Sequence, residues 1–327
     1  MKDVHKARRI LVRSPNWLGD AIMCLPAIKA IAKAARPDEL RVLCVAGLGG
    51  LFGRYPFITD VLQFKKGDSA PAHGLLAGAK YDAIWLFTNS FRSAMDAQKT
   101  KCPIRVGYAG NLRSPLLTHP VAKTAGVHMV DYYLNLVSPF WGTVFSQEAD
   151  FPLLPDEERF ANALALPDGA VGIPLGAKYG PAKCWPHRNL KAFVKMAAEK
   201  GGRTVVLFGT SAERLQADAL EQCAKGKAVN LVGKTTIGQM AAVMRRCAWV
   251  VANDSGPLHV AGAVGAPTVA IFGPTDYRRT APLSDNVRIV SKDAKCAPCL
   301  KRECPTDQHC MKGITAEEIY AIIARNA

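Results

Sequence analysis

The sequence predicts an α/β protein made of two Rossmann-like domains that face each other across a cleft. Short apolar segments alternate with longer segments of helical periodicity along almost the whole chain. The apolar segments are rich in Val, Ile and Leu and do not alternate with polar residues, which is typical of parallel strands buried on both faces. The chain has 327 residues, enough for two domains that each have their own core.

In the first half, an apolar segment at 9–13 predicts the first strand. A helical pattern then runs from Ile22 to Ala35 and ends before Pro37, because proline cannot continue a helix. Further strands are expected at 40–45, 61–64 and 83–87.

The second half repeats this alternation. Strands are expected at 170–174, 204–208, 229–231, 249–252 and 268–272, with helices at 190–200, 216–225 and 237–247. Prolines and acidic residues cluster between 151 and 168, as is common at a domain boundary. We therefore expect domains at 1–155 and 156–327.

Composition and charge narrow the function classes. The sequence contains no apolar run long enough to cross a membrane and no secretion signal at its start, which predicts a cytoplasmic protein. The formal net charge of +15 predicts an anionic partner. The first 150 residues carry 19 Lys and Arg against 11 acidic residues, and the remainder carries 23 against 16. This even spread argues against a dedicated nucleic-acid patch. The anionic partner is then expected to be a phosphorylated acceptor or an anionic membrane surface.

Polar clusters follow three of the expected strands. Asp20 comes after the first strand, where it either interacts favourably with a helix N-terminus or acts as a general base. Lys183 lies in a loop after the strand at 170–174, where α/β domains hold phosphates. A third cluster, at 252–263, contains Asp254, Ser255 and His259, and helix capping accounts for only one of its polar side chains.

These clusters resemble the motifs of the bacterial lipopolysaccharide heptosyltransferases (glycosyltransferase family 9). The matching segments, in chain order, are Asn-Trp-Leu-Gly-Asp at 16–20, Gly-Pro-Ala-Lys-x-Trp-Pro at 180–186, Asn-Asp-Ser-Gly-x-x-His-x-Ala at 253–261 and Phe-Gly-Pro-Thr at 272–275. The segment at 89–94 and the cysteine-rich tail look most like heptosyltransferase II.

The resemblance implies a GT-B fold and inverting transfer of heptose from ADP-L-glycero-D-manno-heptose. The acceptor would be the first heptose of the Kdo-lipid A inner core, at the inner face of the cytoplasmic membrane. The first domain would bind this anionic glycolipid and the second the donor. The implied catalytic residues are Asp20 as the base and Lys183 at the diphosphate. The donor residues would be Gly176, Lys183, Asp254, Ser255, Gly256 and His259, and the acceptor residues Asn89, Ser90, Arg92 and Arg113.

We expect no required cofactor, because no Asp-x-Asp metal motif is visible, although magnesium could stimulate the reaction. Four cysteines, the cysteine quartet, cluster at 296, 299, 304 and 310, and the first two have the spacing of a metal-binding pair. Zinc, an iron–sulfur cluster and reduced thiols are all compatible with this pattern, and we favour reduced thiols. The alternatives for the whole chain are a heptosyltransferase I or III, a two-lobed nucleotide-sugar binding protein or epimerase, and a nucleic-acid binder.

Overall fold

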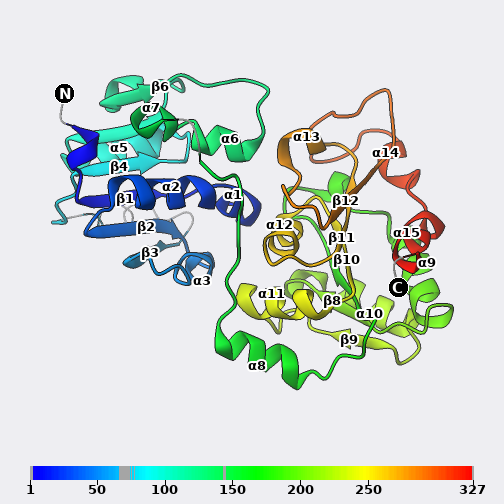
Figure 1. Ribbon diagram of the computed structural model, residues 1–327. Coiled ribbons are helices and arrows are strands. Elements are labelled where there is room, and N and C mark those ends of the chain that lie inside the picture. Colours follow the sequence, from blue (N-terminus) through cyan, green and yellow to red (C-terminus); the bar gives the residue numbers. More distant parts are fainter. Residues whose placement is uncertain (1–2, 66–73, 75, 77, 143–144, 326–327) are drawn as a thin grey trace. The chain divides into compact units, whose positions relative to one another are not determined.

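The chain forms two compact units, Met1–Ala149 and Asp150–Ala327. The computed structural model describes residues 3–65, 74, 76, 78–142 and 145–325. Each unit has one six-stranded parallel sheet with flanking helices, so the predicted α/β class is confirmed (Figure 1). The backbone N–H of Phe151 donates to the carbonyl of Ala263, so the chain joins the second unit ahead of residue 155.

The sheet of the first unit has the strand order β3-β2-β1-β4-β5-β6. Its strands are β1 (Arg9–Arg13), β2 (Glu39–Val45), β3 (Asp60–Phe64), β4 (Ala83–Leu86), β5 (Ile104–Tyr108) and β6 (His119–Val121). Ile10, Leu11 and Val12 of β1 have no exposed surface, as the uninterrupted apolar pattern predicted. The strands β5 and β6 are absent from the sequence-based assignment, because each mixes apolar residues with Arg, Gly, His or Pro.

Short helices connect these strands. They are α1 (Leu18–Met23), α2 (Leu25–Ala35), α3 (Gly49–Phe52), α5 (Phe91–Lys99), α6 (Met129–Leu134) and α7 (Ser138–Trp141), with 3₁₀ turns at Val4–Lys6 and Ser114–Leu116. The helical pattern predicted up to Pro37 is interrupted at Cys24. Pro26 causes this break, because it has no N–H to bond to the preceding turn and its ring clashes with that turn.

The sheet of the second unit has the strand order β12-β11-β10-β7-β8-β9. Its strands are β7 (Val171–Pro174), β8 (Val205–Phe208), β9 (Ala228–Asn230), β10 (Trp249–Asn253), β11 (Thr268–Phe272) and β12 (Val287–Ser291). All residues of β7, β8, β10 and β11 are buried. The edge strand β12 was not predicted from the sequence, because it is largely exposed and carries charged and polar residues.

Most helices of the second unit are longer than most of those in the first. They are α8 (Pro155–Ala163), α9 (His187–Glu199), α10 (Arg214–Cys223), α11 (Ile237–Arg246), α12 (Gly256–Ala263), α13 (Tyr277–Thr280), α14 (His309–Lys312) and α15 (Ala316–Ala324), with 3₁₀ turns at Pro181–Lys183 and Ser211–Glu213. The C-terminal helix α15 packs against α9, and α8 packs against α11. Among the described residues, no helix is long and apolar enough to cross a membrane.

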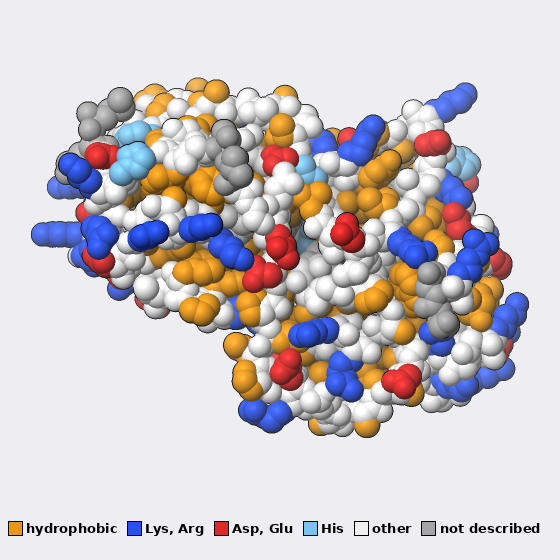
Figure 2. Space-filling model, viewed as in Figure 1, with side chains coloured by type: hydrophobic (Ala, Val, Ile, Leu, Met, Phe, Trp, Pro, Cys, Tyr) orange, Lys and Arg blue, Asp and Glu red, His pale blue; other side chains and the backbone are white. Residues whose placement is uncertain are grey.

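The surface charge is distributed over both units. On the face drawn in Figure 2, Lys and Arg side chains occur on both units and are interspersed with Asp and Glu. This distribution agrees with the even spread of charge along the sequence.

Candidate functional site

The predicted site residues gather at one place in each sheet. Asp20 follows β1 and Asn89 follows β4, and these two strands are neighbours at the centre of the first sheet. Lys183 follows β7 and Asp254 follows β10, which are neighbours at the centre of the second. In both sheets the chain reverses its winding direction between these central strands, and such switch points are where open α/β sheets bind ligands.

The turn that leads to Asp20 is held by Arg13, the last residue of β1. The buried guanidinium of Arg13 donates to the carbonyl of Ser14 and, at 2.8 Å, to Oδ1 of Asn16. Its positive charge also lies over the ring of Phe64, 4.6 Å from the centroid. Burial lowers the pKa of Arg13 to about 10, so the side chain remains charged at neutral pH. Arg13 thereby fixes the segment between β1 and α1.

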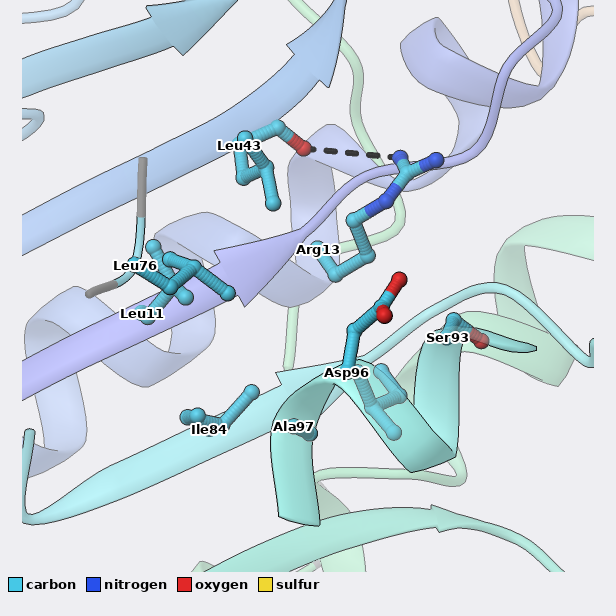
Figure 3. A pocket seen from close by; sticks show the side chains of 9 residues that line it. Leu11, Arg13, Leu43, Leu76, Ile84, Ser93, Asp96 and Ala97 are labelled. Carbon is cyan, nitrogen blue, oxygen red and sulfur yellow. Dashed lines mark hydrogen bonds between the residues drawn. The ribbon is translucent and has the colours of Figure 1, made fainter. Parts of the chain in front are cut away.

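A cavity beside Arg13 is too small to hold a substrate. It measures about 20 Å³ and lies between β1, β4 and α5, with mostly apolar side chains around it (Figure 3). The carboxylate of Asp96 points toward Arg13 there. A cavity of this size has room for a single water molecule, so we assign it to the core of the first unit.

Asp20 lies in the first turn of α1, where it is half-buried. The phenol of Tyr133, on α6, donates a hydrogen bond of 3.1 Å to Oδ1 of Asp20. Tyr133 is buried between the rings of Phe87 and Tyr132, at centroid distances of 5.6 and 5.5 Å. Burial, and then the negative charge of Asp20, raise the pKa of Tyr133 well above its ordinary value. The phenol is therefore a permanent donor to this carboxylate.

Asn89 and Ser90 lie in the loop after β4, and Arg92 lies in the first turn of α5. Asn89 donates through Nδ2 to the hydroxyl of Tyr132 at 2.6 Å. Ser90 caps α5 by accepting the N–H of Ser93. Arg92 is about half exposed and pairs with Asp96 one turn along the helix, at 3.3 Å. Of the four predicted acceptor residues, Ser90 and Arg92 are exposed, and Asn89 is half-buried.

Arg113 has a different environment from the other predicted acceptor residues. Its side chain is 1% exposed and donates to the backbone carbonyls of Tyr108, at 2.8 Å, and Thr88. A third, longer contact of 3.5 Å reaches Oδ1 of Asn89. The guanidinium therefore joins the ends of β4 and β5. We propose that Arg113 positions the Asn89 loop and does not touch the acceptor itself.

In the second unit, three loops converge on the carboxylate of Asp254. Lys183 and Thr275, from the loops after β7 and β11, each donate to Oδ2 of Asp254 at 2.5 Å. The side chains of Lys183 and Asp254 are 13% and 5% exposed, so the ion pair is largely desolvated. Because a buried charge requires a partner, Asp254 holds the ammonium group of Lys183 in place.

The cysteine-rich tail also holds the Lys183 loop, through bonds to the backbone of that loop. Gln308 donates through Nε2 to the carbonyls of Pro181, Ala182 and Cys184, at 3.1–3.2 Å. The N–H of Ala182 donates to the carbonyl of Arg302. These bonds fix the 3₁₀ turn on which Lys183 lies, a role for the tail that its sequence did not reveal.

The cysteine quartet is part of this tail. All ten cysteines are free thiols, and those of the quartet range from the exposed Cys296 to the buried Cys310. Burial raises the pKa of Cys310, and the charges of the other three thiols raise it further. In the described part of the chain, no three His, Cys, Asp or Glu side chains are grouped so that they could hold a metal ion.

The remaining donor-side residues lie at the start of α12 and in the loop after β7. Ser255 precedes α12, and its buried hydroxyl has no hydrogen-bond partner among the residues that the structure describes, while Gly256 is the first residue of the helix. His259 is buried one turn further on. Gly176 has a left-handed φ of +71°, and a Cβ there would lie 2.8 Å from Oε1 of Glu213. Gly176 therefore permits both the turn and the close approach of Glu213.

The sequence model of glycosyltransferase family 9 (heptosyltransferase) matches residues 73–309. The chain belongs to this family.

Several heptosyltransferases resemble the chain over most of its length. Lipopolysaccharide heptosyltransferase 2 of Salmonella typhimurium is 29% identical and covers 86% of this chain and 87% of its own. Lipooligosaccharide heptosyltransferase 2 of Campylobacter jejuni is also 29% identical and covers 97% and 98%. The structure of Escherichia coli ADP-heptose lipopolysaccharide heptosyltransferase II superimposes with a TM-score of 0.80 at 24% identity, covering 97% and 98%.

The packing of the cysteine-rich tail against the Lys183 loop can be tested at Gly180. A Cβ at this position would lie 2.4 Å from the backbone carbonyl oxygen of Arg302, and backbone cannot move away as a flexible side chain can. Gly180→Ala should therefore destabilise the second unit by about 1–3 kcal/mol in urea unfolding. The control is Gly50→Ala in α3, where a Cβ would meet nothing within 4 Å. Equal stability of the two variants would contradict this packing.

Proposed function

We propose that this glycosyltransferase moves heptose from ADP-L-glycero-D-manno-heptose to the first heptose of the Kdo-lipid A inner core, with inversion at the anomeric carbon. The proposal is supported most strongly by one observation. The carboxylate of Asp20 follows β1, a central strand of the first sheet. The ammonium group of Lys183, which Asp254 fixes, follows β7, a central strand of the second. The choice of heptose as the sugar and of a lipopolysaccharide precursor as the acceptor is supported by the names of the relatives, lipopolysaccharide and lipooligosaccharide heptosyltransferase 2.

On the acceptor side, Asp20 is the proposed general base. It takes the proton of the attacking hydroxyl while the new oxygen–carbon bond forms at the anomeric carbon. In the same step the bond from that carbon to the diphosphate oxygen breaks, and ADP leaves. One displacement of this kind inverts the configuration and passes through an oxocarbenium-like state.

On the donor side, Lys183 is proposed to neutralise the charge that grows on the departing diphosphate. Asp254, which also accepts from Thr275, supports this role because it fixes the ammonium group. The buried hydroxyl of Ser255, which no described residue contacts by a hydrogen bond, and the backbone at Gly256 are proposed to donate to diphosphate oxygens. Gly176 and His259 complete the proposed donor site.

The acceptor is proposed to be polyanionic and anchored in a lipid. Arg92 offers an exposed cation at the first switch point, with Asn89 and Ser90 beside it in the chain. The net charge of +15 favours approach to an anionic surface, so we propose peripheral contact with the inner face of the cytoplasmic membrane. No nucleic acid is part of this proposal.

No metal ion is required in the proposed mechanism. Lys183 and the backbone N–H groups at the start of α12 would supply the positive charge that a divalent ion supplies in other transferases. Magnesium would at most stimulate turnover.

The function is tested with an ADP-release assay on Kdo-lipid A acceptors with and without one heptose, in EDTA and in magnesium. We expect turnover only on the heptosylated acceptor, and in both buffers. Turnover on the acceptor without heptose would instead assign a type I enzyme. Binding of ADP-heptose without ADP release on either acceptor would favour a type III acceptor or a non-catalytic binding protein.

Replacement of the proposed base gives a second prediction. Asp20→Asn should lower kcat by about 10²- to 10⁴-fold, because the acceptor hydroxyl loses its proton acceptor. The affinity for ADP-heptose, measured by calorimetry, should stay close to that of the wild type. A variant with near-wild-type turnover would exclude Asp20 as the base.

Replacement of the donor-side cation should affect both binding and chemistry. Lys183→Ala should weaken ADP-heptose binding and lower kcat by about 10²- to 10³-fold. The exposed Lys178 of the same loop offers a matched control, and Lys178→Ala should be nearly silent. Since Lys183→Ala also leaves Asp254 buried without its cation, the double variant with Asp254→Asn separates the two effects. It should regain thermal stability and remain slow, whereas recovered turnover would indicate that Lys183 is only structural.

A further inference from the structure

Tyr133 connects the proposed base to a part of the first unit that sequence analysis did not link to it. Tyr133 and Asp20 are 113 positions apart, and α6 packs against both α1 and α2. The side chain of Tyr133 is 3% exposed, and its hydroxyl is 3.1 Å from Oδ1 of Asp20. A buried hydroxyl aimed at a half-buried carboxylate restricts the rotation of that carboxylate.

The helix that carries Tyr133 is itself firmly held. Tyr108 donates through its hydroxyl to the backbone carbonyl of Tyr132, and Asn89 donates to the Tyr132 hydroxyl. Trp85, in β4, donates through Nε1 to the carbonyl of Leu136, just after α6, at 3.3 Å. Bonds from β4, from the loop after it and from β5 thus set the position of α6, and with it the position of the Tyr133 hydroxyl.

We propose that Tyr133 is a positioning residue for Asp20, and that its hydrogen bond both orients the carboxylate and stabilises its charged form. The proposal rests on the role of Asp20 as the base. A general base must be ionised and aimed at the proton it removes, and small misalignments are costly. Because the hydrogen bond favours the ionised form, Asp20 stays competent as a base at lower pH than it would without the Tyr133 hydroxyl.

Two further titratable groups, Cys24 and Tyr132, lie near this pair. Cys24, at the junction of α1 and α2, is fully buried, and its Sγ donates to the carbonyl of Ala21. Burial, and then the charge of Asp20, raise the pKa of Cys24 well above its ordinary value, so the thiol stays neutral. From α6, burial also raises the pKa of Tyr132, which stays neutral as well. Neither group changes charge where a carboxylate titrates.

The test is Tyr133→Phe in the full-length protein, with two readouts. In the first, the carboxyl carbons of ¹³C-labelled aspartate are titrated by NMR, and the Asp20 signal is assigned by its loss in Asp20→Asn. The midpoint should move to higher pH by about half a unit or more, because the ionised form has lost a donor. This readout needs no substrate, so it decides the proposal even if ADP-heptose is not the donor.

In the second readout, kcat is measured against pH on the heptosylated acceptor. The acid limb should move to higher pH, and kcat on the alkaline plateau should fall about tenfold, since misorientation persists when Asp20 is fully ionised. In the Asp20→Asn background, Tyr133→Phe should have no further effect on kcat. Activity of Asp20→Asn itself would remove the base assignment and leave the NMR result standing.

The neighbouring Tyr132→Phe is the matched control. It makes the same change on the same helix but breaks the bond to Asn89, so the Asp20 midpoint should not move. If Tyr133→Phe disturbs the fold, 3-fluorotyrosine at position 133 keeps the ring and gives a stronger donor, which should move the midpoint to lower pH. An unchanged midpoint in both Tyr133 variants, or an equal loss of kcat in the Asp20→Asn background, would overturn the proposal.

Discussion

The reversal of chain winding at the centre of each sheet is the constraint on which the candidate site depends. In the first sheet, the chain runs outward in one direction after β1 and in the other direction after β4. In the second sheet, the same holds for β7 and β10. The carboxyl ends of the two neighbouring central strands are therefore left open in each sheet. β4, β7 and β10 are buried along their length, and β1 is buried from Ile10 onward, so the exposed polar side chains gather where these strands end. The same constraint, applied twice in one chain, produces one group of functional residues in each unit.

Each of these groups has one charged side chain that a buried neighbour keeps in place. In the second unit, Asp254 holds the ammonium group of Lys183 and itself accepts from Thr275, and in the first, Tyr133 holds the carboxylate of Asp20. Charges at a half-buried site would otherwise lose hydration without compensation. The second arrangement contains a full ion pair and the first a neutral donor, so Asp20 retains its net negative charge. A net negative charge suits the proposed general base, whereas the ion pair fixes the ammonium group of Lys183 without adding net positive charge.

The sequence predicted the parts of this arrangement that depend on local pattern. β1 and β11 begin and end where the apolar segments do, and the motifs around Asp20, Lys183 and Asp254 lie at strand ends as expected. Interactions between distant segments were not predictable in this way. Tyr133 lies on a short helix with no clear periodicity, and Gln308 lies beyond the last expected strand. Arg113 was predicted as an acceptor residue, but its side chain is buried and donates to carbonyl groups at the ends of β4 and β5. Only the folded chain reveals that Tyr133 and Gln308 support predicted residues and that Arg113 is buried.

The two candidate sites also differ in how firmly they are built, which bears on how such an enzyme can change its acceptor. The Lys183 loop is fixed by a buried ion pair and by the three carbonyls that accept from Gln308, so few substitutions there leave the donor site intact. The proposed acceptor side carries the exposed Arg92, near the start of α5, and the almost fully exposed Leu112, which precedes the buried Arg113. Exposed side chains can be replaced at little cost in stability, whereas the buried arginine beneath them cannot. Acceptor choice can therefore vary at these exposed positions while the donor site and the base remain unchanged.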